Sequence, residues 1–123
     1  MRITPCVPTQ TAPGHASIYT GSTPSRHGIV ANHPYDRASQ RTIYVMTDSA
    51  ARTIGAGSLR RSPHRLLATT LGDEIERRTD GAGKTIGVAL KDRASVCPSG
   101  APAMPRIGCP IPAANSLRAI GTE

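Results

Sequence analysis

The chain contains no phenylalanine and no tryptophan, and this shortage of large apolar side chains limits what it can fold into. Leucine, isoleucine and valine together supply 21 of its 123 residues. An independent domain of this length must bury roughly two-thirds of the surface that its unfolded chain exposes. Twelve glycines and eleven prolines further favour loops over regular elements. The composition therefore predicts part of a larger fold rather than an autonomous domain.

Simple features exclude several protein classes. No apolar run approaches the roughly 20 residues that a membrane-spanning helix needs, so no membrane span is predicted. Residues 1–5 lack the apolar stretch of an export signal peptide, so we expect no signal peptide here. The three cysteines, Cys6, Cys97 and Cys109, lie far apart and include no Cys-x-x-Cys pair, so neither a zinc module nor a disulfide framework is indicated. No partner protein can be inferred.

A net charge of +7 is large for a chain of 123 residues, but the way the charges are distributed gives little support to a polyanionic partner. The arginines are scattered along the chain, and no run contains more than two of them. No aromatic residues alternate with them to stack on bases, as nucleic-acid binders require. Specific nucleic-acid binding is therefore not predicted. A non-catalytic basic chain that binds polyanions loosely remains an alternative.

The residues from Thr11 to Gly21 predict a short helix. Thr11 suits the N-cap, Pro13 the first turn and Gly21 the stop. Residues 43–46 form a short strand candidate, because they combine β-branched and aromatic side chains.

The second half of the chain predicts a helix followed by a strand. Leu67, Leu71 and Ile75 recur at four-residue spacing and predict a helix that opens at residues 62–63 and ends by Gly81. Residues 85–90 are apolar on both faces, which indicates a strand buried in a parallel sheet. This order predicts an α/β fold, in which chemistry gathers past the carboxyl ends of strands. Residues 91–93, Lys-Asp-Arg, stand at that point.

A family resemblance arises from residues 11–29, which read Thr-Ala-Pro-Gly-His-Ala-Ser-Ile-Tyr-Thr-Gly-Ser-Thr-Pro-Ser-Arg-His-Gly-Ile. They closely resemble the nucleophile segment of the alkaline phosphatase superfamily, with Thr11 at the position of the nucleophile. Sulfatases of the superfamily carry Cys or Ser there, so a sulfatase is not predicted. Asn32 follows Thr11 by 21 positions, where phosphatases and nucleotide pyrophosphatases of the superfamily carry a phosphate-binding asparagine.

A second motif narrows the resemblance. Residues 87–95 contain Lys91 and Arg93 and resemble the Lys-x-Arg segment of the phosphate-irrepressible alkaline phosphatases, which are monoesterases. The phosphodiesterase and nucleotide pyrophosphatase branch lacks that pair. Residues 62–74 are also similar to the monoesterases. Three motifs in the right order are a specific signal, whereas each alone would be weak. Taken singly, Thr11 could be only a helix cap, Asn32 a turn residue and the two cations a solvated strand end.

The resemblance implies a fold, a chemistry and a cofactor. It implies a sandwich with a mostly parallel central sheet, of which this chain is an incomplete fragment. It implies that Thr11 attacks phosphorus, as a zinc-bound alkoxide, and that Asn32, Lys91 and Arg93 bind the phosphate of a monoester substrate. The family uses two zinc ions, and the remaining ligands of those ions are absent from this chain. The chain alone is therefore expected to be inactive. Members of the family are generally periplasmic or secreted.

The C-terminal residues differ in texture from the rest. We predict a partial phosphatase-like domain over residues 1–100 and a Pro/Ala-rich disordered tail over 101–123. Shifting the reading frame of residues 103–108 by two bases permits the string Asp-Ala-Ala-Tyr-Trp, which resembles the family's own continuation. A frameshift origin of the tail is therefore a hypothesis that the genomic DNA decides. The function predicted for the chain is a fragment of a metal-dependent phosphoric monoester hydrolase; a phosphodiesterase or nucleotide pyrophosphatase fragment is the alternative enzyme.

Overall fold

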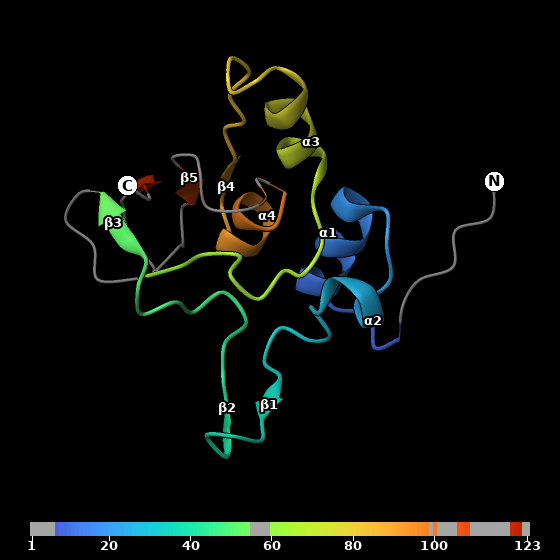
Figure 1. Ribbon diagram of the computed structural model, residues 1–123. Coiled ribbons are helices and arrows are strands. Elements are labelled where there is room, and N and C mark those ends of the chain that lie inside the picture. Colours follow the sequence, from blue (N-terminus) through green and yellow to red (C-terminus); the bar gives the residue numbers. More distant parts are fainter. Residues whose placement is uncertain (1–6, 55–59, 99, 101–105, 109–118, 122–123) are drawn as a thin grey trace.

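The computed structural model of the chain describes residues 7–54, 60–98, 100, 106–108 and 119–121. Short helices and strands are mixed along these ranges, as the predicted α/β class requires (Figure 1). In chain order they are α1 (Thr11–Thr20), α2 (Pro24–His27), β1 (Tyr35–Asp36), β2 (Arg41–Thr42), β3 (Arg52–Ile54), α3 (Leu71–Arg78), β4 (Val88–Ala89), α4 (Asp92–Val96), β5 (Arg106–Gly108) and β6 (Ala119–Gly121). Within the described ranges, no helix has the length and apolar character needed to cross a bilayer.

Helix α1 forms where the sequence predicts it. It ends at Gly21, whose φ of 63° lies in the left-handed region that glycine adopts without steric cost. Its start differs by one residue, because Gln10 is the N-cap and Thr11 is the first helical residue. The Gln10 side chain makes no capping hydrogen bond. The Thr11 hydroxyl is therefore not used as a cap, which matters for the site described below.

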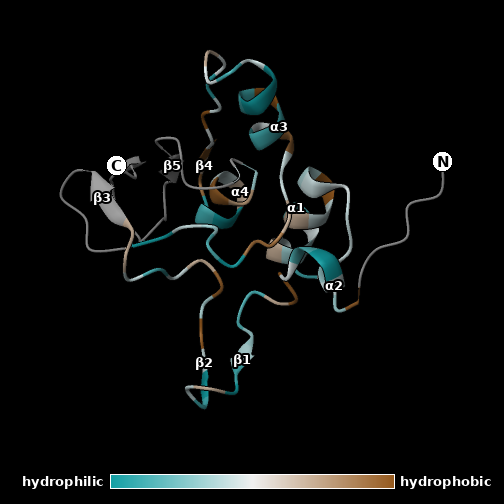
Figure 2. Cartoon of the chain, viewed as in Figure 1, coloured by the Kyte–Doolittle hydropathy of each residue, from teal (hydrophilic) through white to brown (hydrophobic). Residues whose placement is uncertain are grey.

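The core lies between α1, α4 and the loops that connect them. Figure 2 shows apolar segments in the loops and in part of α4 at this centre, whereas α2 and much of α3 are hydrophilic. Cys97 packs there with its Sγ 3.9 Å from the Met46 Sδ, and burial raises the pKa of the Cys97 thiol to about 12. The buried apolar side chains of this core are Ala12, Ala16, Ile29, Val45, Met46, Val96 and Cys97, with Tyr44 and Leu66 packed against them.

The predicted helix over residues 62–81 is wrong in its first half. Helix α3 begins at Leu71, because Thr70 and Asp73 form a capping box in which each side chain accepts from the other's backbone N–H. Ser62 instead donates its hydroxyl to Asp48 and its N–H to the Met46 carbonyl, 3.0 Å away. Residues 62–70 thus cross the core without helical structure, and Leu67 donates its N–H to the His27 carbonyl at 3.0 Å.

Two strand predictions also need correction. Residues 43–46 continue beyond β2 without forming a strand, although Val45 and Met46 are buried. Of residues 85–90, only Val88 and Ala89 pair as strand β4. The expected double-sided burial is absent there, since Ile86 and Val88 are 63% and 67% exposed. The apolar pattern predicted a covered strand, and no described part of the chain covers this one.

The described strands form a two-stranded hairpin and a four-stranded sheet. The hairpin pairs β1 with β2 antiparallel. The order in the larger sheet is β3-β6-β5-β4, and β4–β5 is its parallel pair, while the other two pairs are antiparallel. Strands β5 and β6 lie within the predicted tail, 101–123, and most of that range falls outside the described residues. The tail's disorder and its frameshift origin therefore stay predictions, as does a mostly parallel sheet in the larger fold.

An apolar groove of about 260 Å³ lies between α3, β4 and the end of α1. Leu71 and Ile75, which the helical periodicity assigned to a core, are 59% and 44% exposed beside it. Its lining residues are Tyr19, Leu71, Gly72, Ile75, Thr85, Ile86, Gly87, Val88, Ala94 and Pro98. This part of the surface is therefore as apolar as side chains that normally lie in a protein core.

Candidate functional site

Thr11 stands at the N-terminal end of α1 with its side chain exposed. Its hydroxyl makes no hydrogen bond to any other described residue. The helix dipole places a partial positive charge of about half a unit at this end, which stabilises a nearby anion. A free hydroxyl in this position can approach an anionic ligand.

Asn32 lies beside Thr11, because two hydrogen bonds join it to the start of α1. Its Oδ1 accepts the N–H of Ala12 at 2.8 Å, and its own N–H donates to the Gln10 Oε1 at 2.6 Å. Since the oxygen of the Asn32 amide is occupied, the NH₂ end is left to donate to a ligand. Asn32 and Thr11 are thus brought together although they are 21 positions apart in the sequence.

The helix end offers fewer backbone donors than its sequence suggests. An ideal N-terminus leaves its first N–H groups unpaired. In α1, however, the N–H of Ala12 is bonded to Asn32, Pro13 has no N–H, and the N–H of Gly14 donates to the Gln10 carbonyl at 3.1 Å. Donation to a phosphate at this end therefore depends on side chains more than on the backbone.

Lys91 and Arg93 lie at the other helix of the core. Lys91 is the N-cap of α4 and is exposed, and Arg93 is in the first turn and half-buried. The Arg93 guanidinium lies over the Tyr44 ring, with 5.5 Å between its Cζ and the ring centroid. Its Nε is buried and has no hydrogen-bond partner. A buried, unpaired guanidinium N–H is costly, so the Arg93 side chain favours an anionic partner.

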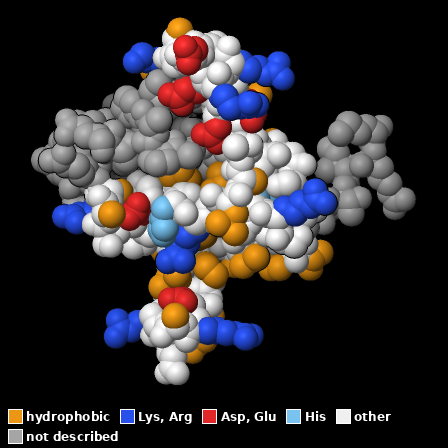
Figure 3. Space-filling view, in the orientation of Figure 1, with side chains coloured by type: hydrophobic (Ala, Val, Ile, Leu, Met, Phe, Trp, Pro, Cys, Tyr) orange, Lys and Arg blue, Asp and Glu red, His pale blue; other side chains and the backbone are white. Residues whose placement is uncertain are grey.

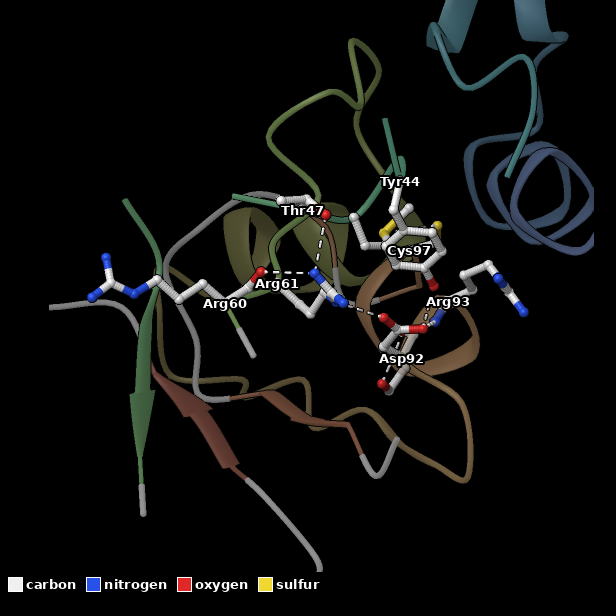
Figure 4. Close-up of polar contacts among 9 residues, drawn as sticks. Tyr44, Thr47, Arg60, Arg61, Asp92, Arg93 and Cys97 are labelled. Carbon is white, nitrogen blue, oxygen red and sulfur yellow. Dashed lines mark hydrogen bonds and ion pairs between the residues drawn. The ribbon is translucent and has the colours of Figure 1, made fainter. Parts of the chain in front are cut away.

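Asp92, between the two cations, is the centre of a hydrogen-bonded cluster (Figure 4). Its Oδ1 accepts the Tyr44 hydroxyl at 2.5 Å and the Arg93 N–H at 2.8 Å. Its Oδ2 accepts from the Arg61 Nε at 3.1 Å. Burial, and then this hydrogen bond to Asp92, raise the pKa of the Tyr44 hydroxyl well above its usual 10, so it stays protonated as a donor. Asp92 is therefore committed to internal contacts rather than to a ligand.

The structure connects Arg93 to the start of α1 through Tyr44. The Val45 N–H donates to the Asn32 carbonyl at 3.0 Å, and the rings of His33 and Tyr44 lie 5.1 Å apart. Helices α1 and α4 also pack against each other, as Figure 1 shows. Thr11 and Asn32 thus lie close together. Arg93 is linked to them indirectly, because the Tyr44 ring lies between its guanidinium and the segment of Asn32 and His33. Lys91 is at the adjoining end of α4, and within the described ranges no hydrogen bond joins its side chain to the other three.

The described residues do not supply a metal site. Nowhere in these ranges do three or more His, Cys, Asp or Glu side chains gather closely enough to hold an ion. Zinc needs three or four protein ligands in fixed geometry. His27 is occupied internally, with its Nε2 3.0 Å from the Ser17 hydroxyl and its Nδ1 accepting from the Ile29 N–H. Asp48 accepts the Ser62 hydroxyl.

His27 gives the fold a pH dependence. Burial lowers the pKa of His27 below its usual 6.5, so folding favours the neutral ring. Its contribution to stability is complete above pH 6.5 and is lost as the pH falls from there toward the lowered value. Urea unfolding at pH 7.5 and pH 5.5 should show a larger loss of stability in the wild type than in His27→Asn, which cannot titrate. An equal loss in both proteins would contradict this account.

Sequence reasoning missed the residues that hold Arg93. Tyr44 was assigned only to a strand, and Asp92 and Arg61 were given no role. One signal was available, namely an acidic residue flanked by two cations at the end of an apolar segment. The contact between Tyr44 and Asp92 spans 48 positions and could not be deduced from spacing.

The excess basic charge is dispersed on the face that Figure 3 shows. Lysine and arginine side chains lie there at several separated places, and acidic side chains lie between some of them. A nucleic-acid interface presents a contiguous basic stripe. This face does not, so its charge gives no support to nucleic-acid binding.

Comparison with known proteins yields both a family and close relatives. The family model for type I phosphodiesterases / nucleotide pyrophosphatases matches residues 1–104. The chain is 43% identical to alkaline phosphatase PafA from Elizabethkingia meningoseptica over 97 residues, which are 76% of this chain and 18% of that enzyme. It is 42% identical to alkaline phosphatase PhoV from Synechococcus elongatus over 98 residues, which are 78% of the chain and 18% of the relative.

Solved structures agree with these matches. The crystal structure of wild-type alkaline phosphatase PafA superposes with a TM-score of 0.69 at 41% identity, covering 72% of this chain and 18% of that one. A PafA variant with one Thr→Ser and three substitutions to Ala, of Asn, Lys and Arg, also has a TM-score of 0.69. The substituted Thr and Asn of that variant are 21 positions apart, and its Lys and Arg are two apart.

The chain thus spans about a fifth of the length of the relatives it matches. The agreement nevertheless extends over most of the described residues, in sequence and in structure. The chain therefore belongs to the type I phosphodiesterase / nucleotide pyrophosphatase family of the alkaline phosphatase superfamily.

Proposed function

We propose that this chain carries the nucleophile and the phosphate-binding residues of a phosphoric monoester hydrolase of the alkaline phosphatase type. The observation that carries the proposal is the hydrogen bond from the Ala12 N–H to the Asn32 Oδ1, 2.8 Å long. It keeps a free amide NH₂ group next to the exposed hydroxyl of Thr11 at the positive end of α1. A nucleophile and a donor to the same phosphate need this proximity.

Thr11 would attack the phosphorus of the ester. The bond from its Oγ1 to phosphorus forms as the bond to the leaving oxygen breaks, and the hydroxyl proton ends on the leaving alcohol. Water then hydrolyses the phosphothreonine, which restores the Thr11 hydroxyl and releases inorganic phosphate. A threonine hydroxyl is a weak nucleophile at neutral pH and needs activation. The dipole of α1 favours its ionised form, because the positive end of the helix faces the hydroxyl.

Asn32, Lys91 and Arg93 would hold the three non-bridging oxygens. The Asn32 amide donates to one oxygen, and the planar fork of Arg93 can bind two. Lys91 adds a point charge at the head of α4. These contacts strengthen as negative charge builds on the transferring group, so they act mainly on the transition state. A dianionic monoester gains more from two cations than a monoanionic diester does.

The PafA variant supports this assignment of roles. It combines substitutions of Thr, Asn, Lys and Arg in one protein. The separations of 21 between Thr and Asn and of two between Lys and Arg equal those of Thr11 to Asn32 and Lys91 to Arg93 here. Each of the four residue types in this chain thus has a counterpart in that relative, with the same spacing within each pair.

The two zinc ions that the resemblance implies do not fit the described residues. The described ranges hold no cluster of three potential ligands, and Asp92 and His27 are occupied by internal hydrogen bonds. Whatever ions serve the reaction would need ligands from beyond these residues.

A phosphodiesterase is the second candidate, and the family model favours it by its own description. The Lys91 and Arg93 pair argues for the monoesterase, because a diester offers one negative charge fewer for two cations to bind. The two alternatives differ in the substrate that these cations select.

A chimaera tests the proposal. Residues 7–98 of this chain replace the matching segment of the Elizabethkingia alkaline phosphatase, which supplies the rest of the fold. We expect the purified chimaera to hydrolyse p-nitrophenyl phosphate, because the exchanged segment brings its own hydroxyl, amide and cations. A correctly folded chimaera without phosphatase activity would contradict the proposal.

The chain by itself is expected to show no turnover. The purified 123-residue protein, supplied with zinc, should release no p-nitrophenol above the rate of buffer, since the described residues hold no metal cluster. Turnover that chelator and Thr11→Ala both abolish would refute this expectation.

A further inference from the structure

The neighbours of Arg93 hold its side chain in place, and the task this serves, binding phosphate, rests on the proposed function. Arg93 projects from the first turn of a five-residue helix, where a long side chain has many rotamers. A guanidinium that binds phosphate through two N–H groups gains from being fixed before the ligand arrives. The surroundings of Arg93 supply such a restraint.

The first part of the restraint is the Tyr44 ring. The Arg93 Cζ lies 5.5 Å from its centroid, within the range of a cation–π contact. A guanidinium that stacks on a ring keeps its N–H groups in its own plane, at the edge, where they stay free to donate. The terminal nitrogens of Arg93 make no hydrogen bond to any described residue. This contact therefore restrains the guanidinium without using its donors.

The second part is Asp92. This carboxylate accepts both the Tyr44 hydroxyl, at 2.5 Å, and the backbone N–H of Arg93, at 2.8 Å. One buried group thus fixes the ring and the start of the side chain that lies over it. Figure 4 shows Arg61 reaching Asp92 from the side opposite to the outer part of Arg93. The Arg61 guanidinium also lies 4.8 Å from the Tyr44 centroid and neutralises the carboxylate.

We propose that Tyr44 and Asp92 are positioning residues for Arg93, with the tyrosine ring as the support of the guanidinium and the carboxylate as the tie that fixes both. Neither residue touches the substrate. Their effect is to present the Arg93 donors to a phosphate with little loss of side-chain freedom on binding.

The Arg93 side chain offers its own spectroscopic test. Its Nε is buried, so the Nε–H proton should exchange slowly and appear in a ¹⁵N spectrum of the full chain. The Tyr44 ring should shift this signal upfield, and Arg93→Lys identifies it by removing it. Tyr44→Leu should abolish the upfield shift and weaken the affinity for inorganic phosphate about five-fold, the size of a partly buried cation–π contact.

Two further variants separate positioning from general structure. Tyr44→Phe keeps the ring but loses the hydrogen bond to Asp92, so it should retain the upfield shift and about half of the affinity. Tyr35→Leu, an exposed tyrosine of β1, should change neither. If Tyr44→Leu fails to fold, the position of the Arg93 Nε–H signal in the wild type and the phosphate titration of Tyr44→Phe still test the positioning role.

The outcomes separate this inference from the proposed function. An Arg93 signal at the unshifted position in the wild type, or a folded Tyr44→Leu that binds phosphate within two-fold of the wild type, overturns the positioning role. A shifted signal that Tyr44→Leu removes, but that phosphate never moves, supports the positioning role and contradicts the proposed function.

Discussion

Replacing Thr11 by alanine in the active chimaera is expected to lower kcat/KM for p-nitrophenyl phosphate by about a thousand-fold or more. The physical reason is that the substitution removes the hydroxyl at the head of α1, beside the Asn32 amide. A residue that forms a covalent bond in the transition state cannot be compensated by binding alone. Steady-state kinetics over a range of substrate concentrations measures the effect, which should appear in kcat.

Two controls accompany that experiment. Thr11→Ser keeps a hydroxyl and should retain substantial activity. Thr42→Ala removes an exposed threonine of β2, away from the head of α1, and should leave the rate within two-fold. A Thr11→Ala chimaera that stays within ten-fold of its parent would remove Thr11 from the reaction and leave it as an ordinary first residue of a helix.

Removing the two cations should change substrate preference rather than activity alone. In the chimaera, the double variant Lys91→Ala, Arg93→Ala is expected to lose about a thousand-fold in kcat/KM for p-nitrophenyl phosphate, since one charge-stabilising donor is often worth a hundred-fold or more. Bis-p-nitrophenyl phosphate carries one negative charge and should lose about ten-fold at most. The ratio of the two rates, measured in the same preparation, is the quantity that decides.

A matched pair of cations controls for net charge. Arg26 and Lys84 are exposed and lie outside the site, so replacing both by alanine lowers the charge equally and should alter neither rate by more than two-fold. Equal losses for the monoester and the diester in the Lys91 and Arg93 variant would argue against selection by charge. That result would favour the phosphodiesterase alternative.

The parts of the fold that depend on local signals could be predicted. Helix α1 and its end at Gly21 follow from a proline in the first turn and a glycine at the stop, and the structure confirms both. The start of α3 was predicted eight residues or more too early, because Pro63 is a plausible first-turn residue. The Thr70 and Asp73 capping box is equally local, and it prevails because Ser62 is bonded to Asp48.

The burial of apolar residues could not be predicted in the same way. An alternating or periodic pattern of apolar residues indicates that one face of an element is suited to packing, but it does not indicate what packs against that face. Ile86 and Val88 carry that pattern, and they are mostly exposed because no described part of the chain packs over them. The exposure of these two side chains depends on which other segments lie next to them, and the pattern of the strand itself does not specify those segments.

The candidate site was predicted in its residue types but not in its supports. Spacing and residue chemistry singled out Thr11, Asn32, Lys91 and Arg93, and their roles stay predictions. The contacts of Asn32 with the start of α1 and of Arg93 with Tyr44 join segments that are distant in sequence. Such contacts depend on the tertiary fold, which no motif in the chain specifies.

The buried position of Cys97 makes its thiol a probe of transient opening of the core. Its thiol is fully buried beside Met46, and burial raises its pKa to about 12, so at neutral pH it offers almost no thiolate to a reagent. In a chain with Cys6 and Cys109 changed to serine, labelling by a disulfide reagent would require the core around Cys97 to open. The labelling rate would then record how often this core opens between α1, which carries Thr11, and α4, which carries Arg93.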